Sequence, residues 1–501
     1  MPPQSPFRYR KIFIFIPHPV AVCTGLRCYH CEHRADKPHQ HNIILIFLFF
    51  FVTSTIPILL RTFPSRREGV SEPETIIIWE DSFLHMGRIN LYDLKPGMVL
   101  GDDLYAPNDR FLLPQGTVLE EKHFKIFKIW GVSEAVIQDL SEETAEVETY
   151  EGIGDDIIEK STDTVNRVFR HANTTHEAVA ELYRLSQLRL ARSLSNGLGD
   201  QDLWLSDVDH STAASGTSPP PDDKPTLPDI IKEDFQFLSL PDTYYKVSEA
   251  INNPQSSASY IARIVSADVG LSAKLIKLVN SSFYGLPQKV DTLSRAVSIL
   301  GSKQLSTLVM GVSVTALFKN IPADLIDIQS FWRHSICCGV VSRLMASMHK
   351  NVNEEPFFVA GLLHDIGRLV LLENYSQLAR SIMDTSQHRE SLLHETEKES
   401  LGFDHAGIGG LLFQQWKLPP SLENCVAYHH EPGKAGSAFE PSIVHLADII
   451  AHTMFMGNSG NLFVPPLDPL AWNELGFSKS VLATIIVQAD HQVDELFSIL
   501  F

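Results

Sequence analysis

The chain has 501 residues, of which 44% are hydrophobic and 20% are charged, and its formal net charge at pH 7 is -19. This length allows two or three domains, and the apolar fraction is large enough for sizeable cores. The acidic balance disfavours a general nucleic-acid-binding protein, because phosphate backbones attract basic surfaces.

The first 85 residues differ in composition from the rest of the chain and are treated as an N-terminal extension, 1–85. They contain a largely apolar run at 43–60, which Pro57 interrupts and three arginines flank at its C-terminal side. One interpretation is a transmembrane segment at 43–60. The interpretation we favour is that translation begins at Met86 rather than Met1. We therefore expect a cytoplasmic protein, which would be membrane-anchored only if the extension is translated.

Residues 86–140 predict a small mixed α/β domain. Short alternating runs at 110–113 and 135–137 predict strands, and the pattern from Glu120 to Trp130 predicts an amphipathic helix. The motif from Ile89 to Leu100 and the one that follows Asp109 are similar to the small N-terminal domain found ahead of many HD-GYP cyclic di-GMP phosphodiesterases. This segment holds no cluster of catalytic side chains, so we expect a regulatory or docking domain.

Two connecting segments follow. Residues 155–194 carry apolar side chains at helical spacing and predict a helical connector of one or two amphipathic helices. Residues 195–228 are rich in Gly, Ser, Asp and Pro, which predicts a flexible linker that lets the flanking domains move relative to each other.

Residues 234–455 predict a helical domain, and 456–501 predict a C-terminal helical extension. Apolar residues recur at spacings of three and four from Ile261 onward. Asp268 and Ser272 lie where helix caps are expected, and Asn280 fits a cap or turn better than a ligand contact. The cysteines of this region are expected to be buried thiols without disulfides, as in a reducing compartment.

A histidine followed directly by an aspartate, His364-Asp365, is the most informative pair in the chain. Imidazole nitrogens and carboxylate oxygens together suit iron, manganese or zinc, and the absence of thiolates from the set argues against a structural zinc site. Further candidates recur beside apolar helical patterns on both sides of the pair. The candidate metal ligands are His334, His364, Asp365, His405, His429, His430 and Asp448.

The order of these residues resembles the HD superfamily of metal-dependent phosphohydrolases. The segment upstream narrows the resemblance, since 238–241, 252–257 and 264–272 are similar to an HDOD domain, as are the later motifs 280–285 and 295–301. HDOD domains are helical relatives of HD phosphohydrolases that usually act as signalling or scaffold modules. The resemblance implies a mainly α fold, with the small mixed α/β domain at its N-terminal side.

By motif position, the resemblance implies one or two divalent ions, with iron or manganese expected. A first ion would be held by His334, His364, Asp365 and Asp448, with Asp365 bridging to a second ion. The second ion would be completed by His405, His429 and His430. If the protein is an enzyme, Asp365 and Arg368 are the expected catalytic residues, and Arg368 could instead be a solvated helix charge.

At several positions this sequence has residues that differ from those of active HD-GYP enzymes. Arg368 stands where those enzymes have lysine, no Gly-Tyr-Pro follows His430, and Ser330 replaces a glutamate found in some members. We therefore prefer a bacterial signal-transduction protein whose HDOD domain binds a partner or nucleotide. The alternative is a metal-dependent HD phosphohydrolase acting on a nucleotide or cyclic dinucleotide. The expected partners are a signalling protein or a nucleotide, with a homodimer as a further option.

Overall fold

The fold is described from a computed structural model of the chain. The described residues are 87–90, 94–105, 111–130, 132, 134–138, 150, 152–197, 225–230, 240, 242–253, 256–286, 288–318 and 320–501. The predicted N-terminal extension, with its apolar run at 43–60, and most of the predicted linker lie outside the described residues.

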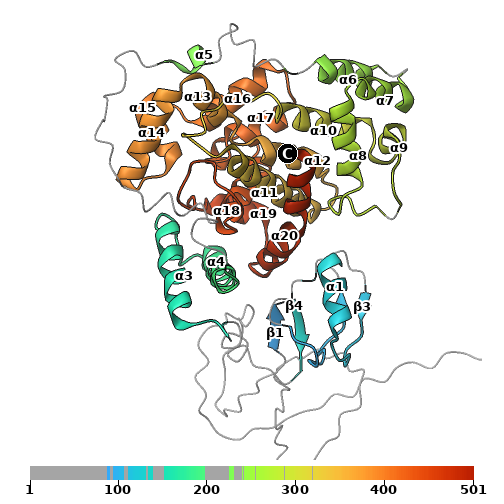
Figure 1. Cartoon of the computed structure of the whole chain (residues 1–501), viewed down its shortest axis with the longest axis vertical. Helices are drawn as coiled ribbons and strands as arrows, with labels where there is room; N and C mark the ends of the chain where they lie inside the picture. Colours follow the sequence, from blue (N-terminus) through green and yellow to red (C-terminus); the bar gives the residue numbers. More distant parts are fainter. Residues whose placement is uncertain are drawn as a thin grey trace, which may run out of the picture. The chain divides into compact units, whose positions relative to one another are not determined.

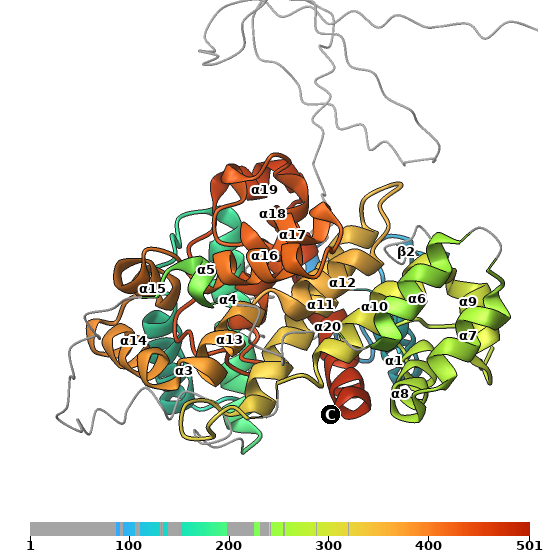
Figure 2. The same cartoon turned by 90° about the horizontal axis from the view of Figure 1, so that it is seen from above.

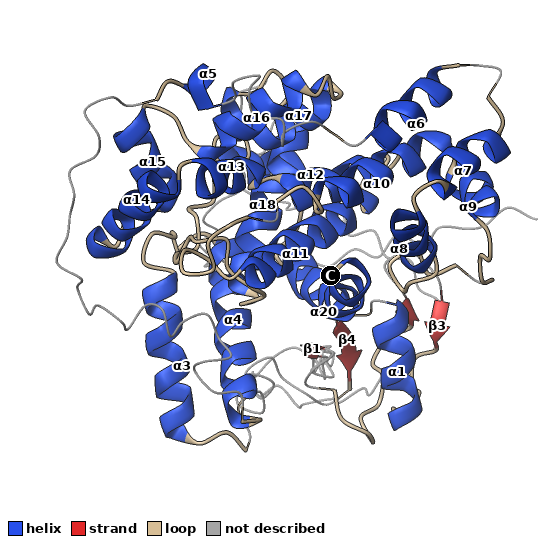
Figure 3. Ribbon diagram, turned by 45° about the horizontal axis from the view of Figure 1, so that its top comes forward, coloured by secondary structure: helices blue, strands red, loops and turns tan. Residues whose placement is uncertain are grey.

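The small N-terminal part is mixed α/β, as the sequence predicts. It contains two antiparallel strand pairs, β1 with β4 and β2 with β3, and one helix, α1. Figure 3 shows these strands in red, and all remaining labelled elements of the described chain in blue as helices. The elements are β1 (Gly87–Asn90), β2 (Leu104–Tyr105), β3 (Phe111–Leu113), α1 (Glu121–Trp130) and β4 (Glu134–Ile137).

Helix α1 lies where the amphipathic pattern predicts it, and β3 and β4 coincide with the two predicted strand runs. The helix buries Phe127 against Leu100, Leu119 and Ile137, which come from the strands and the turns between them. Burial of these side chains is the main stabilising contribution available to so small a unit.

The rest of the described chain is helical, which confirms the predicted mainly α class (Figure 1). Its first half comprises α3 (Asp155–Val168), α4 (Glu177–Ser195), α5 (Leu227–Ile230), α6 (Asp242–Asn252), α7 (Ala258–Ser266), α8 (Val269–Val279), α9 (Leu293–Leu300) and α10 (Ser302–Val314). Its second half comprises α11 (Ile328–Ser347), α12 (Glu355–Leu363), α13 (Ile366–Asn374), α14 (Ser376–Arg389), α15 (Leu393–Leu401), α16 (His405–Gln415), α17 (Pro420–Ala427), the 3-10 turn η4 (Pro432–Lys434), α18 (Phe439–Thr453), α19 (Pro469–Leu475) and α20 (Ser480–Leu500).

Helix α11 is the centre of this helical body and packs against α12, α18 and α20. Helices α6 to α9 lie toward one end of the body and α13 to α15 toward the other, as Figures 1 and 2 both show. The approach of α11 and α12 is close: a Cβ placed on Gly361 would lie 2.7 Å from the carbonyl oxygen of Cys338. Only glycine permits this spacing, which brings the ends of α11 and α12 toward the same region.

The local capping predictions are partly confirmed. Asp268 caps α8 by accepting a hydrogen bond from the backbone N–H of Leu271, and Asn280 ends the same helix while bonding Val290. The prediction for Ser272 is wrong, because this residue lies inside α8 and its hydroxyl donates back to the carbonyl of Val265. A cap residue precedes the helix, whereas the N–H of Ser272 already makes a helical bond to the Asp268 carbonyl.

Replacement of Asp268 by alanine is expected to lower the free energy of unfolding by about 1 kcal/mol, because the Leu271 N–H loses its acceptor. Chemical denaturation measures this change. Asp268→Asn is the matched control, since an asparagine oxygen also accepts at an N-cap, and it should stay near the wild-type value. Equal stability of all three proteins would contradict the capping assignment.

The segment predicted as a helical connector forms two helices, α3 and α4, that share the large hydrophobic core of the helical body. Ser186 donates to the carbonyl of Thr453, and Arg189 donates to the carbonyl of Met454 and to Asp490 of α20. The loop after α18 also bonds α3, through the Val464 N–H and the Val168 carbonyl. Residues 155–195 are therefore packed onto the end of α18, next to the segment that carries Asp448.

Two further findings concern the described part of the chain. The cysteines there, Cys337, Cys338 and Cys425, are buried free thiols, as predicted. None of its single helices has both the length and the apolar content needed to cross a membrane, although α9 and α10 together meet these criteria across a bend of 117°.

Candidate metal centre

The helical body brings all seven candidate ligands to one place. His334 lies in α11, His364 and Asp365 lie at the junction of α12 and α13, and Asp448 lies in α18. His405 begins α16, and the pair 429–430 follows the end of α17. All seven are buried except His430, which is half-buried.

One group of ligands surrounds Asp448. Its Oδ1 atom lies 3.1 Å from Nε2 of His334 and 3.5 Å from Nε2 of His364. His364 Nε2 is also 3.3 Å from Oδ2 of Asp365. Two carboxylates and two imidazoles from α11, the α12–α13 junction and α18 thus converge on one point, which we name the Asp448 group (His334, His364, Asp365 and Asp448).

Hydrogen bonds to the backbone fix the orientation of the His364 and His429 rings. In each ring Nδ1–H donates over 2.7 Å to a backbone carbonyl, that of Gly361 for His364 and that of Val426 for His429. This bond fixes the tautomer, so Nε2 carries the lone pair. Both Nε2 atoms are buried and have no hydrogen-bond partner. The Nε2 atom of His364 faces the carboxylates of Asp365 and Asp448, so a cation, either a proton or a metal ion, fits between them.

In the metal-free protein a proton serves this purpose. Burial opposes protonation of His364, but the adjacent Asp365 carboxylate outweighs it and holds the pKa of His364 well above its ordinary value. Burial also opposes ionisation of Asp448, yet the imidazoles of His452, His334 and His364 hold the pKa of this carboxyl well below its usual range. The carboxylate is therefore ionised at neutral pH and ready to bind a cation.

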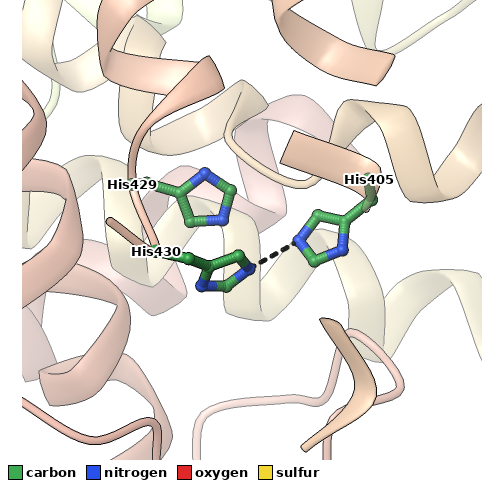
Figure 4. A group of neighbouring side chains, drawn as sticks. All are labelled: His405, His429 and His430. Atoms are coloured by element: carbon green, nitrogen blue, oxygen red, sulfur yellow. Dashed lines mark hydrogen bonds between the residues drawn. The ribbon is translucent and has the colours of Figure 1, made fainter. Parts of the chain in front are cut away.

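The second group consists of His405, His429 and His430, whose ligand nitrogens lie within 4.8 Å of one another. Figure 4 shows the three rings turned toward a common space, with Nε2 of His430 lying 3.0 Å from Nε2 of His405. Burial and the positive charges of His364 and His405 lower the pKa of His429 to about 3, so its ring is neutral. We name this set the three-histidine group.

Asp365 joins the two groups, because its Oδ1 lies 2.8 Å from Nε2 of His405 and 4.0 Å from Nε2 of His429. His405 has a second carboxylate partner, since its Nδ1 is 2.6 Å from Glu397. Burial and Arg368 oppose its protonation, but Glu397 and Asp365 prevail and raise the pKa of His405 to about 9.

Arg368 is buried beside Asp365 and is not a solvated helix charge. Its Nη1 donates to Asp365 Oδ2 over 3.0 Å and to the carbonyl and hydroxyl of Ser459 over 2.9 and 2.7 Å. Its Nη2 lies 3.1 and 3.2 Å from the two ring nitrogens of His405. The guanidinium is therefore bound between Asp365, Ser459 and the ring of His405.

The residues present fit a divalent ion at the Asp448 group. Nitrogen and carboxylate donors in this mixture are typical ligands of first-row divalent metals. The Nε2 atom of His364 is buried without a hydrogen-bond partner, which fits a metal ligand. His334, His364, Asp365 and Asp448 would hold this ion.

Sequence reasoning missed three residues of the centre. His452 lies one helical turn after Asp448, with Nε2 3.4 Å from Asp448 Oδ1, and belongs to a ligand set with His334 and Asp448. Its spacing of four from Asp448 was the available signal, because such residues share a helix face. Glu397, in α15, and Ser459 gave no such signal, since neither belongs to a recognisable motif.

Comparisons with known proteins agree with this description. The fold and the histidine–aspartate cluster define a helical domain with a candidate metal centre. Within it, residues 237–432 match the family model of the HDOD domain, so the chain contains an HDOD domain. Asp448 and His452 lie beyond the matched residues.

An uncharacterized protein from Treponema pallidum is 26% identical over 212 residues, which are 42% of this chain and 40% of that protein. Among solved structures, an HDOD domain protein of unknown function from Geobacter sulfurreducens is 20% identical, with 52% of this chain and 91% of that chain covered and a TM-score of 0.44. A protein from Shewanella amazonensis, provisionally described as a phosphohydrolase, is 24% identical, with 52% and 94% covered and a TM-score of 0.43.

Metal affinity is expected to rise with pH. Because the pKa of His364 is raised, a proton occupies its Nε2 near neutrality and must leave when a metal ion binds. At every pH below the raised pKa of His364, release of one proton strengthens binding by roughly tenfold per pH unit. Competition with a chelator of known affinity measures this slope. Binding that is independent of pH would contradict the assignment of His364 as a ligand.

Proposed function

We propose that the chain is a bacterial signal-transduction protein whose HDOD domain holds a divalent metal ion, iron or manganese, in a site closed to phosphoester substrates. The domain would bind a partner protein or a nucleotide and relay its state to the small N-terminal domain. One observation supports the proposal most strongly. All the ligand residues that the resemblance implies are present, yet protein atoms bury almost all of them.

The enclosure is seen in the burial of the ligands. His334, His364, His405 and His429 have no exposed surface, and Asp365 and Asp448 are only 2% and 4% exposed. Beside the centre, a cavity of about 10 Å³ is lined by Arg368, Glu397 and six apolar side chains, and none of the seven candidate ligands lines it. A phosphoester could contact ligands buried to this extent only after the domain opened. An ion here would therefore act first on the structure of the domain, by joining α11, α12 and α18.

A metal-dependent phosphohydrolase is the second candidate, and the retained ligand set favours it. A bound ion would polarise a phosphoryl oxygen and lower the pKa of a bound water. In that case Asp365 would position the reacting groups, and Arg368 would be the phosphate-binding cation. Arg368 already bonds Asp365 and Ser459, however, so it would have to leave both partners before it could contact a phosphate.

Hydrolysis assays separate the two candidates. The manganese- or iron-loaded chain is incubated with cyclic di-GMP and with a panel of nucleotide phosphoesters. The signalling proposal predicts no turnover above that of the double variant His364→Ala, Asp365→Ala. Turnover that depends on metal and disappears in the double variant would overturn this proposal in favour of the phosphohydrolase.

A further inference from the structure

We propose that the guanidinium of Arg368 takes the place of a second metal ion, so that the centre holds a single ion at the Asp448 group. This inference rests on the proposed metal site. It concerns the number of ions and the role of Arg368, which the ligand motifs alone leave open.

The position of Arg368 is the first argument. Two metal ions that share a bridging carboxylate lie about 3.5–4 Å apart. Asp365 would be that carboxylate, since its Oδ2 faces His364 of the Asp448 group and its Oδ1 faces His405 of the three-histidine group. Arg368 Nη1 bonds the same Oδ2 atom at 3.0 Å, while Nη2 lies against the ring of His405. A fixed positive charge thus contacts both Asp365 and the ring of His405, the two residues that would bind a second ion.

The partners of His405 are the second argument. Both of its ring nitrogens already face carboxylate oxygens. Nδ1 lies 2.6 Å from an oxygen of Glu397, and Nε2 lies 2.8 Å from an oxygen of Asp365. Glu397 also accepts from the backbone N–H of His405 over 2.9 Å, and this bond fixes the start of α16. A metal ion on Nε2 of His405 would have to enter between this atom and Asp365, and there it would lie close to the guanidinium.

The two halves of the centre therefore differ in charge. The Oδ1 atom of Asp448 faces three imidazole nitrogens, those of His334, His364 and His452, at 3.1, 3.5 and 3.4 Å. At the other half, the guanidinium lies between Asp365 and Glu397, whose carboxylates it partly neutralises. The cation of the second half is permanent, because a guanidinium does not lose its proton, whereas only imidazoles surround Oδ1 of Asp448 in the first half.

The anchoring of Arg368 shows that its position is built into the fold. The carbonyl and hydroxyl of Ser459 hold Nη1, and both Arg368 and Ser459 are buried. The arginine is therefore kept in place by the loop that follows α18 as well as by the carboxylates. Its bonds position the carboxylate of Asp365, so Arg368 is a positioning residue for the single ion.

Metal counting tests the inference. The wild-type chain, Arg368→Gln and the charge-preserving control Arg368→Lys are loaded with excess manganese, freed of unbound ion and analysed for metal per folded chain. We expect one ion in the wild type and in Arg368→Lys, and two in Arg368→Gln. Adding His405→Ala to Arg368→Gln should return the count to one. An unchanged count in Arg368→Gln, or two ions in the wild type, would overturn the inference.

The outcomes distinguish this inference from the proposed function. A wild-type chain without any ion would contradict the proposed function, whereas a gain of one ion in Arg368→Gln would still support the role of Arg368. If Arg368→Gln does not fold, electron paramagnetic resonance of the manganese-loaded wild type decides. The spectrum of an isolated ion supports the inference, and the spectrum of two coupled ions overturns it.

Discussion

Replacement of Asp365 by alanine is expected to abolish metal binding and to lower the free energy of unfolding by about 3–5 kcal/mol. Asp365 supplies one oxygen to each half of the centre, and it is the buried partner of Arg368. Removal of one partner of a buried ion pair leaves an uncompensated buried charge, and this charge accounts for most of the lost stability. Calorimetric metal titration and chemical denaturation measure the two effects.

Two controls separate loss of a ligand from loss of folding. Asp365→Asn keeps the shape and can still accept a bond from Arg368, so it should lose most of the metal affinity with a smaller loss of stability. Asp384→Ala removes an exposed carboxylate from α14 and should change neither quantity. Retention of wild-type metal affinity by Asp365→Ala would remove this residue from the centre.

Replacement of Gly367 by alanine is expected to destabilise the domain by at least about 2–3 kcal/mol. A Cβ at this position would lie 2.1 Å from the carbonyl oxygen of His405 and 2.8 Å from the backbone nitrogen of Gly409. Both contacts are with backbone, so α13 and α16 must move apart, which costs more than the repacking of a side chain. The shift would also carry His405 away from Asp365.

The matched control for this substitution is Gly436→Ala. A Cβ at Gly436 would meet nothing within 4 Å, and this glycine is not among those with positive φ. Chemical denaturation of the metal-free proteins should show a large loss for Gly367→Ala and little change for Gly436→Ala. A change below about 0.5 kcal/mol in Gly367→Ala would show that the two helices are not in such close contact.

The sequence predicts the helices well, because apolar residues at spacings of three and four mark the faces that pack into the core. The same reasoning finds α1, β3 and β4 and the Asp268 cap, for which the determinants are local. It fails at Ser272, since an aspartate four residues earlier already serves the helix start. Local signals do not show that α3 and α4 share the core of the helical body, because that packing depends on residues more than 260 positions away.

In the candidate site, too, the sequence identifies some residues and misses those whose roles depend on distant segments. The ligand residues were carried over by resemblance, and the structure places all seven in one cluster. The role of Arg368 could not be read from the sequence, since its partners Ser459 and Glu397 come from segments that no motif marks. An arginine on a helix is usually solvated, and only the fold shows that this one is buried between carboxylates.

The central proposal is that the helical body binds a metal ion at His334, His364, Asp365 and Asp448. Elemental analysis of the purified full-length chain tests it most directly, with the double variant His364→Ala, Asp365→Ala prepared in parallel. The account predicts one iron or manganese ion per chain in the wild type and none in the double variant. A wild-type chain without metal, or equal metal content in both proteins, would contradict it.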